Sequence, residues 1–468
     1  MAYPLKKDVI NEIVKIICEK IDVGEYGDNV QSEELLSFEI AKNKSEGIQK
    51  IREANDEEYR SYITNLLDSM LNEDGDYVTK NGEAVFISSK EKAQIIEQVF
   101  GNYRGFGLIG PLLMDEEVTE LMINGPDNLF IEKKGKVIRL DTRFCEDTDC
   151  EEEERIKRGE VQLRRIIHRI ADRCNREVNE ANPIVDARLG KEYNGSRVNI
   201  VLKPIAMHGD TVTIRKFSKK PMSIERLVEL GSITNEIAAK LRMLVAAKYN
   251  IFISGGTGSG KTTFLNALSN FIPSDERIIT IEDSAELQIT AIDNLVSLET
   301  KQANSEGKGA ITIKDLIKSS LRMRPERIVV GECRGEEALD MLQAMNTGHD
   351  GSLSTGHANS AKDMLTRLET MVLQGASGLP LDAVRRQIGS ALDIIIHLSR
   401  MRDHSRKVVE ITEVLGYEGG EIKLNTLYKF EEDKDTTTVE KVSGSLNRTQ
   451  NPMQNTDKLR LAGIFQDI

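Results

Sequence analysis

The spacing of hydrophobic positions changes along the chain and divides it into regions with different expected structures. In the first hundred residues, apolar side chains recur at helical spacing within a polar sequence, as at residues 9–17. We therefore predict a helical N-terminal region over residues 1–104. Its segment 34–71 is rich in Glu, Lys, Ile and Leu. We interpret this segment as a solvated helical appendage, and a partner-binding module is the alternative.

From residue 105 onward, glycines and short runs typical of strands replace the helical pattern. The expected elements are a helix at 116–122, a hairpin with strands at 129–132 and 136–140, a helix at 161–178, and strands at 197–202 and 211–217. This mixture of short helices and strands predicts a small α+β domain over residues 105–217.

The third region begins after residues 218–222, whose polar Ser-Lys-Lys-Pro sequence predicts a linker. Apolar strands are expected at 251–254, 277–281 and 327–331, alternating with helical stretches. Such alternation predicts an α/β domain with a parallel sheet over residues 223–430. Residues 431–468 are rich in Thr, Asn, Asp and Lys, and we predict a weakly ordered tail.

A glycine-rich loop directly follows the strand expected at 251–254. From Gly255 to Thr262 it matches the pattern G-x-x-x-x-G-K-[ST], and helical sequence follows it. Backbone N–H groups of such a loop surround phosphate oxygens, Lys261 adds positive charge, and the Thr262 hydroxyl can coordinate Mg²⁺. The predicted nucleotide-binding residues are Gly256, Thr257, Gly258, Ser259, Gly260, Lys261, Thr262 and Thr263. The alternative is a glycine-rich connecting turn, which the strand–loop–helix context disfavours.

A phosphate-binding loop also needs an acidic residue at the end of another buried strand, to organise Mg²⁺ and water. Glu332 follows the strand at 327–331, and Glu282 ends the strand at 277–281. One carboxylate can orient the metal shell while the other accepts a proton from the attacking water. An ordinary loop charge is the alternative for either acid taken alone.

Histidines and arginines complete the candidate chemistry. His349 and His357 lie in a loop of small residues between 347 and 360, where an imidazole can approach a phosphate; zinc binding is the competing idea, but no Cys or third His lies nearby. Charge on the transferred phosphoryl group must be neutralised by cations. The candidate arginines are Arg197, Arg215, Arg322, Arg324 and Arg334, and a surface salt bridge is the alternative for each.

The overall composition restricts the class of function. A formal net charge of −13 argues against general affinity for nucleic acid or anionic membranes. The five cysteines form no C-x-x-C pair, which is typical of reduced thiols rather than a disulfide framework. No run of apolar residues is long enough for a transmembrane helix, and the N-terminus lacks the features of a signal peptide. A cytoplasmic location is therefore expected.

In this order, the motifs of residues 105–430 resemble the ATPases of type II and type IV secretion and of type IV pili. The run Ile279-Thr-Ile-Glu282-Asp283 is similar to the family's aspartate box, Ile328-Val-Val-Gly-Glu332 to its Walker B segment, and residues 347–360 to its histidine box. The sequences around Arg197 and Arg215 are most similar to the tight-adherence (Flp) pilus assembly branch, which is close to the conjugation ATPases.

The resemblance implies a fold and a role for each residue. It implies a RecA-like P-loop NTPase domain preceded by a small α+β, PAS-like domain. Glu282 would be the general base or would position water, and Glu332 would hold Mg²⁺ through its water shell. His357 would sense the γ-phosphate, while Arg197 and Arg215 would reach the nucleotide from the preceding domain.

The resemblance also implies partners. It implies an ATP- and Mg²⁺-dependent motor for pilus assembly or protein secretion, working as a homo-hexamer on an inner-membrane platform protein. Membrane contact would then be peripheral, through that partner. The four-cysteine zinc module found in the type II secretion branch is absent from this sequence, which disfavours that branch.

Two other classes of function remain as alternatives. A DNA translocase or conjugation-type ATPase would share the RecA-like core, although the acidic balance and an aromatic content of 5% offer few stacking platforms for bases. A small-molecule kinase or a GTPase would leave the histidine loop unexplained, and the sequence lacks an N-K-x-D guanine motif.

Overall fold

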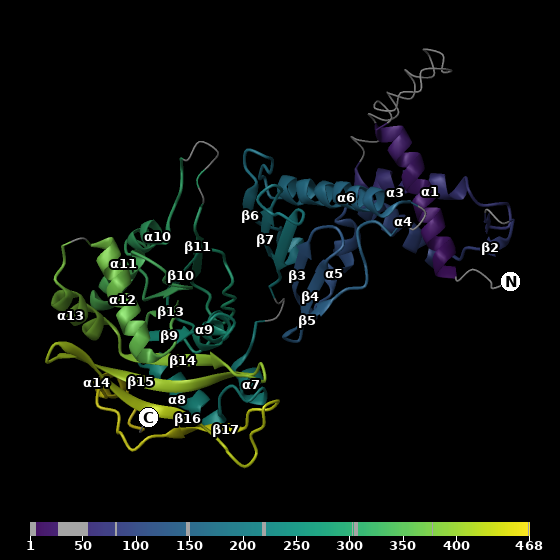
Figure 1. Cartoon of the computed structure of the whole chain (residues 1–468). Helices are drawn as coiled ribbons and strands as arrows, with labels where there is room; N and C mark the ends of the chain where they lie inside the picture. The colour runs from purple at the N-terminus through teal and green to yellow at the C-terminus, as the bar shows by residue number, and fades with distance from the viewer. Residues whose placement is uncertain are drawn as a thin grey trace. The chain divides into compact units, whose positions relative to one another are not determined.

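The computed structural model describes residues 6–26, 55–79, 82–146, 150–217, 221–301, 303, 308–376, 378–466 and 468. The chain forms two compact units, residues 1–219 and 220–468 (Figure 1). Part of the predicted linker, residues 218–220, and part of the predicted appendage, residues 34–54, lie outside the described residues.

The first part of the N-terminal unit is mainly helical. Its elements are α1 (Lys6–Tyr26), α3 (Asp56–Asp68), α4 (Ser89–Tyr103) and a hairpin of β1 (Asp76–Val78) and β2 (Ala84–Phe86). Capping boxes at Asn55 and Ser88 fix the starts of α3 and α4. The three helices enclose a small core of their own, which includes the fully buried Ile13, Ile63 and Ile95.

A six-stranded antiparallel sheet forms the second part of this unit, in the order β5-β4-β3-β8-β7-β6. Its strands are β3 (Val118–Asn124), β4 (Leu129–Lys133), β5 (Lys136–Arg139), β6 (Ile184–Arg188), β7 (Arg197–Val201) and β8 (Thr211–Arg215). The short helices are η2 (Gly107–Ile109), α5 (Gly110–Met114) and η3 (Lys191–Tyr193). Helix α6 (Glu152–Arg173) packs against the sheet through residues such as Leu163 and Ile167 (Figure 1).

The helix predicted at 116–122 is wrong, because this segment lies in the central strand β3. The register between β3 and β4 shifts between Val118 and Glu120, as at a β-bulge. The extra residue places Val118 and Leu121, which are three positions apart, on the same buried face. A spacing of three is the helical pattern that the prediction used.

The C-terminal unit contains a nine-stranded sheet in the order β11-β10-β12-β13-β9-β14-β15-β16-β17. Its parallel strands are β9 (Ile251–Gly255), β10 (Ile278–Glu282), β11 (Leu295–Glu299), β12 (Arg327–Val330), β13 (Leu353–His357) and β14 (Ile394–Arg400). Three antiparallel strands extend the sheet: β15 (Arg406–Glu418), β16 (Glu421–Glu432) and β17 (Gly444–Arg448).

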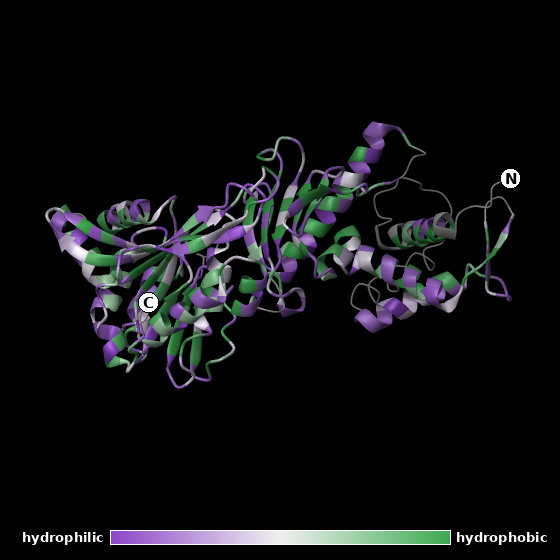
Figure 2. Ribbon diagram, turned by 90° about the horizontal axis from the view of Figure 1, so that it is seen from below, coloured by the Kyte–Doolittle hydropathy of each residue, from purple (hydrophilic) through white to green (hydrophobic). Residues whose placement is uncertain are grey.

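Helices cover both faces of this sheet. One layer has α7 (Ile224–Glu229), α8 (Asn235–Ala246), α9 (Lys261–Ser269) and α14 (Asp457–Leu461), and the other has α10 (Ile313–Ser320), α11 (Glu337–Asn346), α12 (Ala361–Gly375) and α13 (Leu381–Ala391). Successive residues of β9 pack into different cores: Ile251 and Ile253 pack against the first layer of helices, and Phe252 packs against the second. Strand β9 is accordingly buried at every position, and hydrophobic segments run through the C-terminal unit (Figure 2).

The prediction of a weakly ordered tail at 431–468 is contradicted by β17 and α14, which extend the fold of the C-terminal unit. The buried Glu413 carboxylate accepts hydrogen bonds from the backbone N–H groups of Gln454 and Asn455. Lys458 Nζ lies 2.8 Å from Asp350 Oδ1 and 2.7 Å from Asp393 Oδ2. Both aspartates precede parallel strands, so the C-terminal segment is fastened to the amino edge of the sheet.

Arg327 is a fully buried arginine at the start of β12. Its Nε and Nη2 atoms donate to the carboxylate of Glu276 at 2.5 and 2.8 Å, and Nη1 donates to the Val245 carbonyl at 2.6 Å. This pair joins the segments that enter β10 and β12. Removing one partner of such a pair leaves a buried charge without compensation.

We predict that Arg327→Ala lowers the stability of the C-terminal unit by about 3–5 kcal/mol, because the buried Glu276 would lose both guanidinium hydrogen bonds and keep Lys248 at 3.7 Å. Thermal unfolding followed by circular dichroism would measure the loss. The exposed Arg322, replaced by Ala, is the matched control and should stay within about 0.5 kcal/mol of wild type. Equal stability of the two variants would contradict a structural role for the buried pair.

Candidate functional site

The glycine-rich loop connects β9 to α9, as its sequence predicts. Gly258 and Gly260 adopt φ angles of +72° and +91°, which side chains other than glycine strongly disfavour. Ser259 Oγ donates to the Gly256 carbonyl at 2.8 Å and so tightens the loop. The first N–H groups of α9 have no partners within the helix, so this end of the helix is suited to an anion.

Three predicted site residues converge below this loop. Lys261 Nζ donates to the Gly256 carbonyl at 3.0 Å and lies 3.2 Å from His357 Nδ1. His357 Nε2 lies 3.0 Å from Glu332 Oε1. They come from α9, the end of β13 and the loop after β12, because parallel strands end at the same edge of the sheet. The structure thus brings together residues that are up to 96 positions apart.

The protonation states within this group follow from its contacts. Burial, followed by the positive charge of Lys261, lowers the pKa of His357, so the imidazole is neutral at neutral pH. A lysine ammonium can only donate, and Nδ1 must therefore accept, which leaves the proton on Nε2 facing Glu332. The contact with Glu332 Oε1 lacks hydrogen-bond geometry, so this buried oxygen keeps an unused acceptor position.

Glu332 also has a second cationic neighbour. Arg334 Nη2 donates to Glu332 Oε2 at 2.7 Å, and its Nη1 lies 3.7 Å from Asp283 Oδ2. Of the three arginines predicted near this strand, Arg334 alone follows the carboxyl end. Arg322 and Arg324 precede β12 and lie at the amino edge. This position separates them from the candidate site.

Glu282 is the second predicted acid, and it is held in a closed environment. Its Oε1 atom accepts hydrogen bonds from the N–H groups of Glu286 and Leu287 at 2.9 and 3.0 Å. A Cβ atom on Gly331 would lie 2.9 Å from Glu282 Cγ, so a side chain at position 331 would collide with it. Burial raises the pKa of Glu282 to about 7, against the opposing effect of these two hydrogen bonds.

The two predicted histidines do not share a site. His349 precedes β13, and its Nδ1 lies 3.2 Å from the Ala344 carbonyl at the end of α11. His357 ends the same strand at the opposite edge of the sheet. The prediction that both imidazoles approach a ligand is therefore wrong for His349.

Arg197 and Arg215 lie next to each other in the N-terminal unit. They face each other in register on β7 and β8, and Glu120 of β3 is the register partner of Arg215 on its other side. The charge of Arg215 acts to lower the pKa of Glu120, but burial is the larger effect and raises it. The two predicted arginines thus lie side by side at the ends of two neighbouring inner strands, at the start of β7 and the end of β8.

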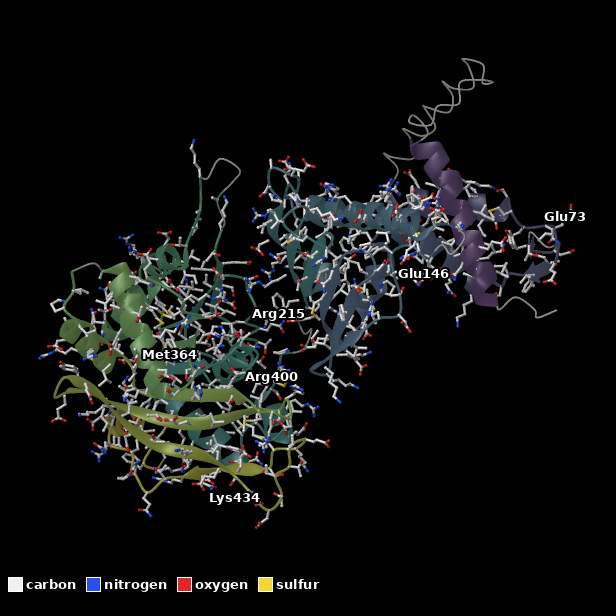
Figure 3. All side chains as sticks on the ribbon, in the orientation of Figure 1. Glu73, Glu146, Arg215, Met364, Arg400 and Lys434 are labelled. Atoms are coloured by element: carbon white, nitrogen blue, oxygen red, sulfur yellow. The ribbon has the colours of Figure 1, made fainter. Side chains whose placement is uncertain are left out.

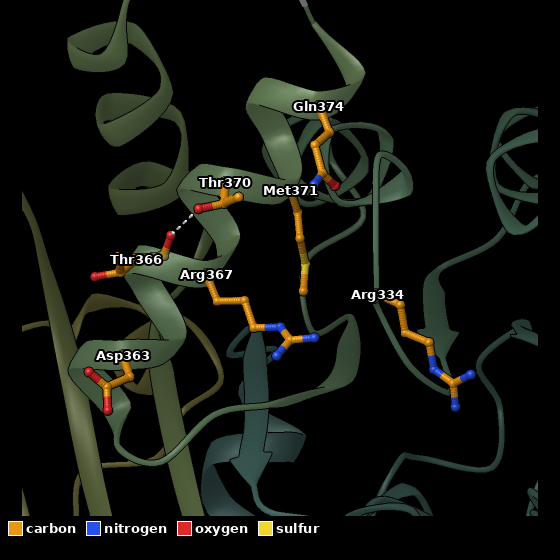
Figure 4. A pocket seen from close by; sticks show the side chains of 7 residues that line it. All are labelled: Arg334, Asp363, Thr366, Arg367, Thr370, Met371 and Gln374. Atoms are coloured by element: carbon orange, nitrogen blue, oxygen red, sulfur yellow. Dashed lines mark hydrogen bonds between the residues drawn. The ribbon is translucent and has the colours of Figure 1, made fainter.

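A polar pocket borders Arg334 on the side of α12 (Figure 4). Its lining residues are Arg334, Asp363, Thr366, Arg367, Thr370, Met371 and Gln374. After burial and Lys261, the positive charges of Arg334 and Arg367 also lower the pKa of His357. Charged residues that line the pocket therefore act on the site below the P-loop.

The residues present fit Mg²⁺ in the way that nucleotide-binding proteins hold it. Among the described residues, no three His, Cys, Asp or Glu side chains form a cluster that could hold a metal ion. Mg²⁺ sites in such proteins use one or two protein oxygens together with substrate phosphates. Thr262, in the first turn of α9, and the unused Oε1 of Glu332 can supply them.

Sequence reasoning missed Arg406, whose Nε donates to the Gly258 carbonyl of the loop at 2.9 Å. It is 148 positions from its partner and belongs to the hairpin of β14 and β15. The parallel pairing of β14 with β9 is the signal that could have placed this hairpin beside the loop.

Strand, glycine loop and helix within this sheet define a RecA-like P-loop nucleotide-binding domain. The family model described as type II/IV secretion system protein matches residues 103–451. The chain therefore belongs to the type II/IV secretion system protein family. Among the described helices, none is both long and apolar enough to cross a membrane.

Two curated relatives and one solved structure illustrate what this chain is similar to. A putative conjugal transfer protein of Mycobacterium tuberculosis is 34% identical over 67% of this chain and 86% of the relative. The conjugal transfer protein TrbB of Rhizobium radiobacter is 32% identical over 69% of this chain and 91% of the relative. The crystal structure of the VirB11 ATPase from the Brucella suis type IV secretion system, in complex with sulphate, is 29% identical; it covers 64% of this chain and 90% of its own, with a TM-score of 0.35.

We predict that hydrolysis of ATP requires the ionised form of Glu282 and rises with pH through about 7. The raised pKa leaves a large fraction of this carboxyl group protonated, and so unable to accept a proton, below neutral pH. The measurement is kcat/KM against pH in excess Mg²⁺, since this ratio reports groups of the free enzyme.

Glu282→Gln is the matched variant, because its amide oxygen can still accept the two backbone hydrogen bonds. It should bind ATP and lose hydrolysis by about 10²–10⁴-fold. A variant with wild-type turnover, or a flat profile between about pH 6 and 8, would contradict the role of this acid.

Proposed function

We propose that this protein is an ATP-hydrolysing motor of a pilus or secretion machine. The observation that carries the proposal is the convergence of Lys261, His357 and Glu332 directly below the P-loop. A lysine, a neutral histidine and a carboxylate at this position can bind, detect and help to cleave a terminal phosphate.

Each residue has a role consistent with its contacts. Lys261 moves from Gly256 and His357 to the terminal phosphates, and the loop N–H groups surround the phosphate oxygens. Thr262 and Glu332 would hold Mg²⁺, Glu332 through water, and the ion would neutralise phosphate charge. When Lys261 leaves Nδ1 of His357, that nitrogen can take up a proton from solvent and donate it to an oxygen of the γ-phosphate, while Nε2 remains next to Glu332.

Glu282 orients the attacking water and accepts its proton. Its side chain is fixed by two backbone amides and by the absence of a side chain at Gly331. A raised pKa makes the carboxylate a stronger base than an exposed glutamate. A positioned base of this kind contributes about 10²–10⁴-fold to the rate.

Arg197 and Arg215 supply positive charge to the transition state from the N-terminal unit. The two arginines occupy register positions on neighbouring strands, so an anion that reaches both would meet two positive charges. We infer that they act when the two units close on ATP, within one subunit or between neighbouring subunits.

The family membership and the names of the relatives support a place in an export machine. We propose a homo-hexameric ring in the cytoplasm that docks on an inner-membrane platform protein and contacts the membrane through it. Tight-adherence pilus assembly remains our preferred branch from the motif sequences. A conjugation-type ATPase is the second candidate, favoured by the conjugal transfer proteins among the relatives.

We predict that Lys261→Ala reduces ATP hydrolysis by about 10²–10³-fold, because the ammonium group stabilises phosphate charge. Glu332→Gln should bind ATP with near-normal affinity and hydrolyse it poorly. Steady-state ATPase assays with and without single- and double-stranded DNA measure both effects. The exposed Lys434, replaced by Ala, is the control for loss of a lysine charge and should keep wild-type turnover (Figure 3).

The same assay separates the proposed function from its alternatives. Slow hydrolysis that DNA leaves unchanged supports an assembly motor. Strong stimulation of hydrolysis by DNA would instead favour a DNA translocase. Wild-type turnover of Lys261→Ala would contradict the nucleotide site itself.

We predict that Arg215→Ala lowers kcat by about 10²-fold or more while ATP binding to the P-loop persists, because transition-state charge loses a partner. Arg197→Ala should act in the same direction. Arg188 of β6 is the register partner of Arg197, and Arg188→Ala is the control. Unchanged hydrolysis in both Arg197 and Arg215 variants would refute a catalytic role for the N-terminal unit.

A further inference from the structure

The β14–β15 hairpin places two arginines beside the P-loop. Leu398 of β14 pairs in register with Gly255, so Arg400 lies two residues beyond the level at which β9 enters the loop. Arg406 is the register partner of Arg400 across the hairpin. Both arginines are exposed, and Arg400 lies at the end of β14 (Figure 3).

Contacts with the loop come from both side chains. Arg406 Nε donates to the Gly258 carbonyl, and its Cδ atom would be 3.4 Å from a Cβ atom placed on Gly260. Arg400 Nη1 would be 3.8 Å from a Cβ atom placed on Gly258. Arg406 thus holds the outer side of the loop, and Arg400 lies over its tip.

Arg400 and Arg406 differ from the neighbouring Arg402 in their ion pairs. Like charges at directly opposed register positions destabilise a hairpin. In the same turn, Arg402 forms an ion pair with Glu432 at 2.7 Å. In the part of the chain that the structure describes, no carboxylate lies within ion-pair distance of Arg400 or Arg406. The nearby Asp403 instead accepts hydrogen bonds from Ser405 and from Val442 N.

The order of strands shows which end of a nucleotide would meet these arginines. Glu332 and His357 follow β12 and β13, on one side of β9, and they define where the terminal phosphate lies. β14 and β15 lie on the other side of β9. A nucleotide whose terminal phosphate faces Glu332 therefore extends its α-phosphate and nucleoside toward Arg400.

We propose that Arg400 is a nucleoside-contacting residue, whose guanidinium plane stacks on the base of the bound nucleotide, and that Arg406 is a positioning residue that holds the P-loop through Gly258. The proposal rests on the proposed function, because it assumes a nucleotide in the P-loop. Guanidinium groups stack on aromatic rings, and the face of a π-system attracts a cation that lacks a carboxylate partner. His404 Nδ1, 3.1 Å from Arg400 Nη2, orients the side chain.

A ligand without a nucleoside separates this proposal from simple charge attraction. We would measure the affinities of ADP and of inorganic tripolyphosphate, each with Mg²⁺, by isothermal titration calorimetry on the full chain. Arg400→Ala should weaken ADP binding about tenfold and change tripolyphosphate binding less than about twofold, since only ADP carries a base on which the guanidinium group can stack. With ATP, KM should rise while kcat stays within about twofold of wild type.

Arg406→Ala should weaken both ligands, because the loop itself loses a hydrogen bond, and Arg406→Lys should recover most of the loss. Arg402→Ala removes the same charge from the same turn and should leave both affinities unchanged. Lys261→Ala tests the underlying function and should weaken both ligands strongly.

Equal weakening of ADP and tripolyphosphate by Arg400→Ala would overturn the nucleoside contact in favour of a phosphate contact. Wild-type affinities in the Arg400 and Arg406 variants would overturn the whole proposal. If Lys261→Ala also bound both ligands with wild-type affinity, the proposed function and the proposal for the two arginines would both fail. Circular dichroism would confirm that each variant is folded.

Discussion

The parallel alignment of β10, β12, β13 and β9 is the constraint on which the candidate site depends. Side chains that follow these strands come from positions 255 to 357, yet they share one edge of the sheet. Two buried cores hold that alignment, one on each face, and the Arg327–Glu276 pair joins two of the strand entries. The packing of apolar residues in these cores, away from the candidate site, thus fixes the positions of the P-loop, His357, Glu282 and Glu332.

Electrostatic balance within the site follows from this placement. Glu332 has a neutral imidazole on one oxygen and a guanidinium group on the other, whereas Glu282 is surrounded by backbone amides in a buried position. Burial raises the pKa of Glu282 to about 7. Two glutamates with similar sequence contexts therefore differ in chemistry because their surroundings differ.

The sequence predicted the site better than it predicted the borders of the fold. Lys261 and Glu332 could be placed from local patterns, because each comes after an apolar run that predicts a strand, at 251–254 and 327–331. His357 was predicted to lie in a loop of small residues, whereas it is the last residue of β13, whose sequence Leu-Ser-Thr-Gly-His is not typical of a strand. The segment at 116–122 was misread since a β-bulge gave it helical spacing. The ordered C-terminal segment and Arg406 escaped prediction for another reason: their polar groups find partners more than 40 positions away, and no local pattern encodes such contacts.

The resting contacts of Lys261 have a consequence for the working cycle. Its ammonium group lies within hydrogen-bond distance of the Gly256 carbonyl and of His357 Nδ1. When a nucleotide binds, phosphate oxygens thus replace the carbonyl and the imidazole as partners of Lys261. The net gain in binding free energy is smaller than it would be for a lysine without partners inside the protein. The reverse also holds: as products leave, the same two internal groups can recapture the lysine. A motor that must reset many times benefits when its lysine has partners within the protein as well as in the phosphates.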